Sequence, residues 1–259
     1  MADEQGYMGD TRYLEQAAQF LREEKQLTYT AMHIQPGQHV LDVGCGPGVD
    51  TVALAEFVGE SGSVDGVDAD PTLVAAAEHR ASAAGVHDRV HHHVADALAL
   101  PFAAQTFDAV RGERLFQHLS DPHAALAEML RVTRPGGWVV VLDTDYSSST
   151  VDSDQTDLER RLALAAAQSV RSGYVARKLY RLFTDQGLSD ISVTVRPVTS
   201  TRYEVVRGAS LDLIEPGALA SGVVTEEQLD AWHAELEQAD ARNAFFACVN
   251  MILVSGCKP

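Results

Sequence analysis

Residues 39–48 read HVLDVGCGPG, a short apolar run followed by glycines at alternating positions, Gly44, Gly46 and Gly48. A short aliphatic run bounded by glycines is typical of a strand that is buried on both faces, as in a parallel sheet. The glycines predict a tight turn in which the backbone can approach a ligand closely, because no Cβ stands in the way. In open α/β sheets, ligands bind at such turns, beyond the carboxyl ends of the strands.

The sequence on the carboxyl side of this stretch continues to alternate between strand and helix. Further short strands are predicted at Ser63–Val67, Val90–Val94, Phe107–Arg111 and Trp138–Leu142. Between them, Asp70-Pro71 and Asp121-Pro122 each combine a capping carboxylate with a proline at the first helical position. This alternation predicts an α/β fold, a Rossmann-like doubly wound sheet that is mostly parallel.

The pattern changes after Asp145. A polar loop is predicted at Tyr146–Asp154, and the capping box that begins at Thr225 predicts a helix at Glu226–Glu237. Two further helices and the last two of seven strands are predicted at Gln155–Ser169, Tyr174–Gln186, Ile191–Val198 and Ala244–Val254. We therefore expect one domain over residues 37–259, with a core at 38–145 and substrate-shaping additions at 146–187 and 199–242. A helix predicted at Thr11–Met32 would form an N-terminal lid within residues 1–36.

Composition and charge exclude several classes of protein. The 259 residues carry a net charge of −17, which disfavours nucleic acids and anionic membrane surfaces as partners and would suit a cationic small molecule. No apolar run is long enough to cross a bilayer, and the acidic N-terminus does not resemble a signal peptide. The three cysteines are too few for a disulfide framework. We expect a cytoplasmic protein without membrane insertion, and the oligomeric state stays open.

The glycine turn distinguishes between two kinds of cofactor. The dinucleotide fingerprint G-x-G-x-x-G fails, because its third glycine would fall at Val49. Asp42 and the three glycines instead match acid-x-G-x-G-x-G, and the chain resembles the class I S-adenosylmethionine-dependent methyltransferases. It is most similar to the ubiquinone and menaquinone methyltransferase subgroup. The resemblance extends over about residues 38–145 and includes Leu100-Pro101-Phe102 and the segment LAEMLRVTRPGG at 126–137.

The resemblance implies a set of cofactor-binding residues. Asp68, after the second strand, would hold the ribose hydroxyls of S-adenosylmethionine, and Asp96, after the third strand, would accept from the adenine amino group. Ala97 would supply a backbone donor. The full expected set is Asp42, Gly44, Cys45, Gly46, Gly48, Asp68, Ala69, Asp96, Ala97 and Arg111.

Candidate catalytic residues follow strands four and five. His118 lies where the resembling family often has a histidine, and imidazole can accept a proton near neutral pH. An alternative for His118 is packing or a hydrogen bond to Asp121. Asp145 and Asp143 are further candidates for the base. No metal is expected, because the consecutive residues His91, His92 and His93 would point to alternating faces of a strand.

The sequence therefore predicts in-line transfer of a methyl group from S-adenosylmethionine to a small molecule, which could be quinone-like, lipid-like or a specialised metabolite. One alternative is a repurposed fold of this kind that catalyses a non-methylating reaction or binds the cofactor structurally. A second alternative is an NAD-linked oxidoreductase, against which the failed fingerprint counts.

Overall fold

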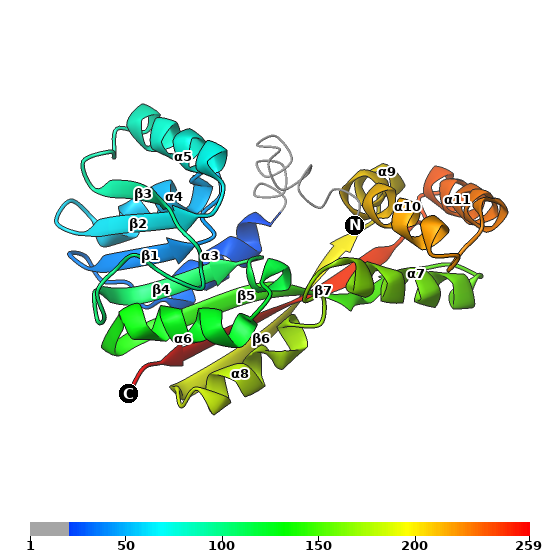
Figure 1. The fold of residues 1–259 in the computed structure, drawn as a ribbon. Helices are drawn as coiled ribbons and strands as arrows, with labels where there is room; N and C mark the ends of the chain where they lie inside the picture. Colours follow the sequence, from blue (N-terminus) through cyan, green and yellow to red (C-terminus); the bar gives the residue numbers. More distant parts are fainter. Residues whose placement is uncertain (1–20) are drawn as a thin grey trace.

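The computed structural model describes residues 21–259, and its centre is one seven-stranded sheet (Figure 1). The strands lie in the order β3-β2-β1-β4-β5-β7-β6, and only β7 runs antiparallel to its neighbours. Their bounds are β1 His39–Val43, β2 Ser63–Asp68, β3 Val90–Val94, β4 Phe107–Glu113, β5 Thr133–Val151, β6 Ser189–Ser200 and β7 Ala247–Cys257. The predicted doubly wound, mostly parallel sheet is confirmed.

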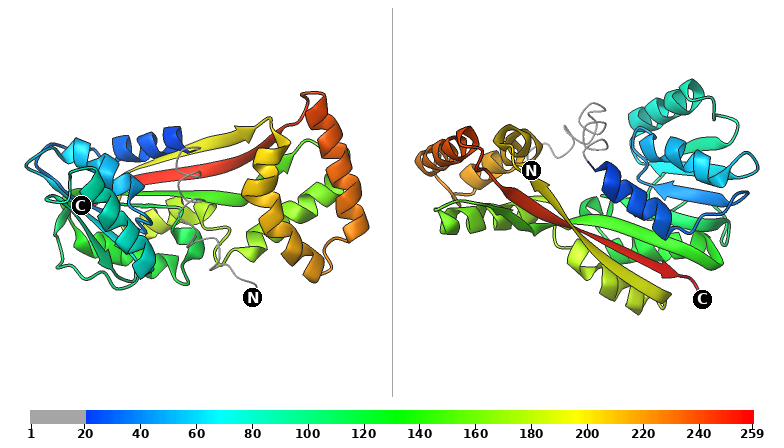
Figure 2. Two further views of the ribbon diagram at one scale, coloured as in Figure 1. Left: turned by 90° about the horizontal axis from the view of Figure 1, so that it is seen from above. Right: turned by 180° about the vertical axis from the view of Figure 1, so that it is seen from behind.

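Helices cover both faces of the sheet (Figure 2). One face packs against α3 (Arg22–Ala31), α4 (Val49–Val58) and α5 (Pro71–Ala83), and its core includes Tyr29 and Leu54. The other face packs against α6 (Pro122–Val132) and α8 (Leu179–Asp185). The predicted caps are confirmed, because Asp70 accepts from the N–H of Thr72 and Asp121 accepts from that of Ala124.

The expected N-terminal lid is only partly within the described residues. Most of the helix predicted at Thr11–Met32, including Arg12 and Tyr13, lies outside them. The described part, α3, lies against the sheet, where Tyr29 and Met32 join the core.

Strand β5 is much longer than predicted. It continues through 19 residues to Val151, so the prediction of a loop at Tyr146–Asp154 is wrong for most of its length. The extension pairs with β7, although the register shifts between Asp145 and Thr150. Serine and threonine fill the extension, and their polarity suggested a loop. Beyond the register shift, pairing of Thr150 and Val151 with β7 holds the end of the strand in place.

A helical layer covers the extended ends of β5, β6 and β7 (Figure 1). It comprises α7 (Thr156–Ser169), α9 (Tyr203–Val206), a π-helical turn (Arg207–Leu211), α10 (Asp212–Ala220) and α11 (Glu226–Ala241). The capping box at Thr225 is confirmed. Trp232, which is 1% exposed, is at the centre of a separate apolar cluster beneath these helices. The sequence analysis did not predict α9 or α10, because Gly208, Pro216 and Gly217 disfavour a helix.

Candidate functional site

The glycine turn after β1 has a backbone that only glycine adopts readily. Gly44, Gly46 and Gly48 have φ angles of 75°, 52° and 75°. At Gly48 the surroundings add a second constraint, because a Cβ built there would lie 2.7 Å from the Cβ of Ala77 on α5. Cys45 is buried, and burial raises the pKa of its thiol, so it serves as a small buried side chain and not as a nucleophile. The turn is therefore held in one conformation at the carboxyl end of β1, beside the switch point between β1 and β4.

Asp68 and Asp96 lie at the same edge of the sheet. Asp68 ends β2, and its two oxygens accept the N–H groups of Gly46 at 2.9 Å and Asp70 at 3.0 Å. Asp68 therefore links the glycine turn to the start of α5, and burial raises its pKa, opposed by those N–H groups. Asp96, just after β3, is exposed and accepts from the N–H of Leu98. Next to these acids, Ala69 is exposed and Ala97 is buried.

Asp42 and Arg111 lie behind the turn and away from solvent. They are 2% and 0% exposed, and Arg111 Nη1 donates to Asp42 Oδ1 at 2.9 Å. Arg111 also donates to Glu113 Oε2 at 2.5 Å. Burial raises the pKa of Asp42 to about 7, although Arg111 opposes the shift. Because both side chains are enclosed, neither presents its charge at the surface of the turn, and they differ in this respect from Asp68 and Asp96.

The pair belongs to a larger charge cluster that also includes α3. Lys25 Nζ donates at 2.7 Å both to Asp50 and to Glu113, and the Tyr29 hydroxyl donates to Asp50. Burial alone would raise the pKa of Asp50, but Arg111 and Lys25 lower it below its usual range. We name this group, Lys25, Tyr29, Asp42, Asp50, Arg111 and Glu113, the buried charge cluster. The sequence analysis missed it, and its only local signal is the i, i+4 spacing of Lys25 and Tyr29 on one helix face.

His118 and Asp143 lie near the ends of β4 and β5. Burial, together with Arg114, lowers the pKa of His118 to about 4, so the imidazole is neutral at physiological pH. Its Nε2 lies 2.9 Å from the side-chain amide of Gln117, which is consistent with a donated N–H. Asp143 is fully buried and accepts from the N–H of Phe116 at 2.9 Å, and burial raises its pKa to about 7.

Asp145 is bound by an arginine. Its two oxygens accept from Nε and Nη2 of Arg177 at 2.9 and 2.8 Å, a bidentate arrangement. The carboxylate is therefore held as an ion partner on the β5 extension. In the described part of the chain, no hydrogen bond or ion pair joins His118 to Asp145.

A cavity of about 570 Å³ lies between the β5–β6–β7 extension and the helical layer, and we call it the large cavity. Most of its lining side chains are aliphatic or aromatic, with contributions from Leu162, Val198, Leu211, Trp232 and Met251. Arg114, which directly follows β4, and Thr144, on β5, also line it. Because β4 pairs with β1, Arg114 lies one strand away from the glycine turn. The additions predicted to shape the substrate site do enclose this cavity, whereas His118 and Asp145 are not among its lining residues.

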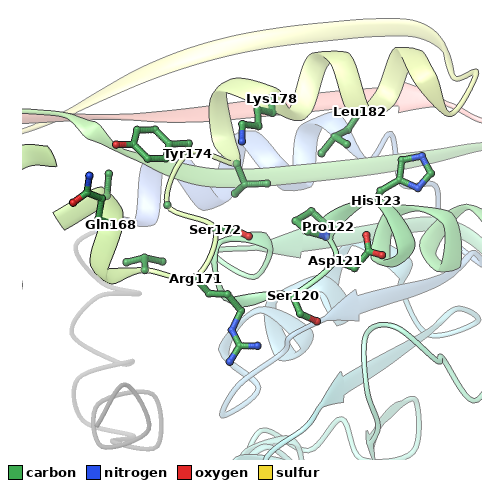
Figure 3. A pocket seen from close by; sticks show the side chains of 14 residues that line it. Ser120, Asp121, Pro122, His123, Gln168, Arg171, Ser172, Tyr174, Lys178 and Leu182 are labelled. Atoms are coloured by element: carbon green, nitrogen blue, oxygen red, sulfur yellow. The ribbon is translucent and has the colours of Figure 1, made fainter. Parts of the chain in front are cut away.

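A second cavity, of about 460 Å³, lies between the start of α6 and the segment that joins α7 to α8 (Figure 3). Arg171, Lys178 and His123 are on its wall, and Asp121 caps α6 there. Its floor is held by Ser172, whose N–H and hydroxyl donate to the carbonyls of Gln117 and Leu119. Arg171 and Lys178 are exposed at this site.

The residues at the sheet edge are of the kinds that S-adenosylmethionine requires. The turn offers backbone in a conformation reserved for glycine, and Gly48 lets α5 pack directly against it. Asp68 and Asp96 supply carboxylates beside it, which suit ribose hydroxyls, an amino group and a sulfonium, whereas a pyrophosphate would meet repulsion. Fold and turn together define a class I S-adenosylmethionine-dependent methyltransferase.

Comparisons with known proteins agree with this class. Residues 40–137 match the family described as "Methyltransferase domain". The chain is 32% identical over 251 residues to an uncharacterised 37.1 kDa protein in transposon Tn4556 of Streptomyces fradiae, covering 95% of this chain and 70% of that protein. It is 38% identical over 120 residues to a demethylmenaquinone methyltransferase of Lysinibacillus sphaericus, covering 46% of this chain and half of that enzyme. The chain belongs to the class I methyltransferase family, and its cofactor is S-adenosylmethionine.

A solved structure shows the same fold over nearly the whole chain. The YcgJ protein of Bacillus subtilis superposes with a TM-score of 0.64 at 20% identity, covering 92% of this chain and 98% of that one.

Membrane-spanning helices and metal-binding groups are both absent from the described residues. Within residues 21–259, no helix is both long and apolar enough to span a membrane. Over the same range, no group of three or more metal-ligating side chains is placed to hold an ion. His92, in the triple-histidine stretch, is buried and bonds to Thr51 and Glu78.

Proposed function

We propose that this protein transfers the methyl group of S-adenosylmethionine to an apolar small molecule that occupies the large cavity. The observation that carries the proposal is the cavity itself, which combines a volume of about 570 Å³ with a mostly aliphatic lining and residues adjoining the cofactor side of the sheet. Cavities of this size and character are typical of sites for small organic ligands. Quinone-like and lipid-like molecules and apolar specialised metabolites share the required chemistry.

The cofactor-binding roles are proposed residue by residue. The backbone of Gly44, Cys45, Gly46 and Gly48 would bind the methionine part, Asp68 and Ala69 the ribose, and Asp96 and Ala97 the adenine. Asp42 and Arg111 would act through the turn, as positioning residues, because both are enclosed in the buried charge cluster.

Catalysis would depend chiefly on orientation. When bound, S-adenosylmethionine supplies an electrophilic methyl group on a sulfonium. The protein would hold the acceptor in line with that group, and proximity and orientation can supply roughly 7–11 kcal/mol. If the acceptor must lose a proton, His118 is the proposed base and Asp145 the second candidate, although neither side chain lines the large cavity. A pKa of about 4 makes His118 a weak base, so its contribution would be near the lower end of the usual 10²–10⁴-fold range.

A calorimetric titration with S-adenosylmethionine, S-adenosylhomocysteine and NAD tests the cofactor part. The first two should bind and NAD should not. Asp68→Ala should weaken binding by about 1–3 kcal/mol, because partners of the carboxylate are left unpaired. Asp88→Ala, which removes an exposed carboxylate paired with Arg89, is the matched control and should leave affinity unchanged. Binding of NAD without binding of S-adenosylmethionine would contradict the proposal.

Incubation with methyl-labelled S-adenosylmethionine and an apolar metabolite extract tests transfer. Label should enter a small apolar product identified by mass spectrometry, and His118→Ala should slow this by about 10²-fold while cofactor affinity is retained. Cofactor binding without transfer to any fraction would instead favour a repurposed, non-methylating protein.

A further inference from the structure

Among the residues that line the large cavity, negatively charged side chains outnumber positively charged ones. Three carboxylates, Glu159, Glu204 and Glu215, line it, and Arg114 is the one cationic residue among the described lining residues. Glu159 accepts from the backbone of Val151 and from Arg160, so its charge is already matched. Glu204 is exposed at the rim. The carboxylate that stands apart is Glu215.

Glu215 lies on α10 and is 8% exposed, so water does not compensate its charge. Its Oε2 is 3.0 Å from Nε2 of His233, whereas its Oε1 is buried and has no hydrogen-bond partner in the described part of the chain. Enclosing a carboxylate oxygen without a partner costs free energy, and native structures retain such groups where something else pairs with them.

The hydrogen bonds behind Glu215 reach only one of its two carboxylate oxygens, Oε2. His233 Nδ1 lies 2.5 Å from the hydroxyl of Tyr203, and that hydroxyl accepts from Arg207 at 3.1 Å. Arg207 itself pairs with Asp212 and Glu237. The row of side chains thus fixes the orientation of Glu215 through Oε2 and leaves Oε1 to be paired from the cavity side, where Glu215 is among the lining residues.

We propose that Glu215 binds a protonated amine of the acceptor, so that the substrate class is an apolar molecule carrying a cationic nitrogen. The inference rests on the proposed use of the large cavity for the acceptor. Glu215 belongs to the helical layer, which lies at the opposite end of the molecule from α5 in both the front and the rear views (Figures 1 and 2). It therefore acts as a specificity-determining residue, and it anchors the acceptor at a distance from the glycine turn.

The test uses three probes with one hydrocarbon chain and different head groups, decylamine, decanol and decanoate, titrated calorimetrically into the full-length protein. Decylamine should bind at least tenfold more tightly than decanol, and decanoate should bind most weakly. In Glu215→Gln, which keeps the size and a hydrogen-bonding oxygen, decylamine should lose about tenfold in affinity while decanol changes less than threefold. Glu204→Gln, which removes a charge from the exposed rim, is the matched control and should change decylamine binding less than threefold.

Two results would overturn the proposal: equal binding of decylamine and decanol by the wild-type protein, or full retention of decylamine affinity in Glu215→Gln. The wild-type series needs no variant, so it decides the matter even if Glu215→Gln fails to fold. The titrations also require no methyl transfer. A protein that prefers the amine yet binds no S-adenosylmethionine would refute the proposed function and leave only the amine preference of Glu215 standing. A protein that binds S-adenosylmethionine but does not prefer the amine would overturn this inference and leave the proposed function standing.

Discussion

The edge of the sheet that bears the glycine turn, which we call the cofactor edge, and the large cavity differ in how the sequence specifies them. At the cofactor edge, buried charges are arranged in close pairs, as between Arg111 and Asp42, and the turn conformation is set by glycines within five consecutive residues. The large cavity is formed by side chains from distant segments, and its helical layer is fastened by long-range contacts such as that between Trp232 and Ser153. The comparison indicates that the glycine turn is encoded locally, whereas the buried charge cluster and the proposed acceptor site both depend on how separate segments pack.

The largest expected effect concerns the buried charge cluster. Arg111→Met should lower the free energy of unfolding by about 3–5 kcal/mol, because Asp42 is left buried without its partner and Glu113 keeps only Lys25. Urea denaturation measures this. Arg134→Met removes an exposed ion pair with Asp108 and should cost less than about 1 kcal/mol. Similar losses in the two variants would mean that charge at the cofactor edge is not specially buried, and the contrast with the cavity would fail.

The second prediction concerns Asp143, which lies on β5 between the two regions. Its pKa is about 7 in the folded protein and about 3.9 when unfolded, so between these values the folded state holds a proton that the unfolded state has lost. The stability contributed by this group therefore falls as pH rises from about 4 to about 7. Urea denaturation should be measured at pH 4.5 and at pH 7.5 for both proteins. Between these two pH values, the free energy of unfolding of Asp143→Asn should rise by about 3 kcal/mol relative to that of the wild type. A constant difference between the two proteins at both pH values would contradict the assigned shift.

The smallest expected effect compares one glycine from each region. Gly48 and Gly222 both have positive φ, but a Cβ would collide with Ala77 only at Gly48, and it would meet open space at Gly222. Gly222→Ala should cost about 1 kcal/mol from backbone strain alone, and Gly48→Ala about 2 kcal/mol more. Thermal unfolding measures the difference, and calorimetry should show that only Gly48→Ala weakens S-adenosylmethionine binding. Equal costs would show that α5 yields to the added methyl group.

The same contrast explains how far the sequence could predict the structure. The alternation of strands and helices, the caps at Asp70 and Asp121 and the glycine turn follow from local rules, in which a residue type and its spacing specify a conformation. The β5 extension could not be predicted in this way, because its polar residues have no apolar alternation and its end, Thr150 and Val151, is ordered by pairing with β7.

The site itself was predictable to a similar degree. Asp68 and Asp96 do lie at the edge where the sequence placed them, although their roles stay predictions. The burial of Arg111 depends on Lys25 and Asp50, which are separated from it by 86 and 61 positions, and no spacing rule connects such residues. The orphan oxygen of Glu215 likewise depends on which side chains α11 brings against α10.

The ladder between β6 and β7 has a consequence for how an acceptor could enter. Its register is continuous from the Ser192–Ser255 pair to the Ser200–Ala247 pair, beside the point where β5 loses register with β7. The ladder runs from the central part of the seven-stranded sheet into the wall of the large cavity. A hinge between these two parts of the molecule would therefore have to break several backbone hydrogen bonds at once. We therefore expect an acceptor to enter by local opening of the segment Tyr203–Ala220, which comprises α9 and α10, while the strands beneath it stay paired.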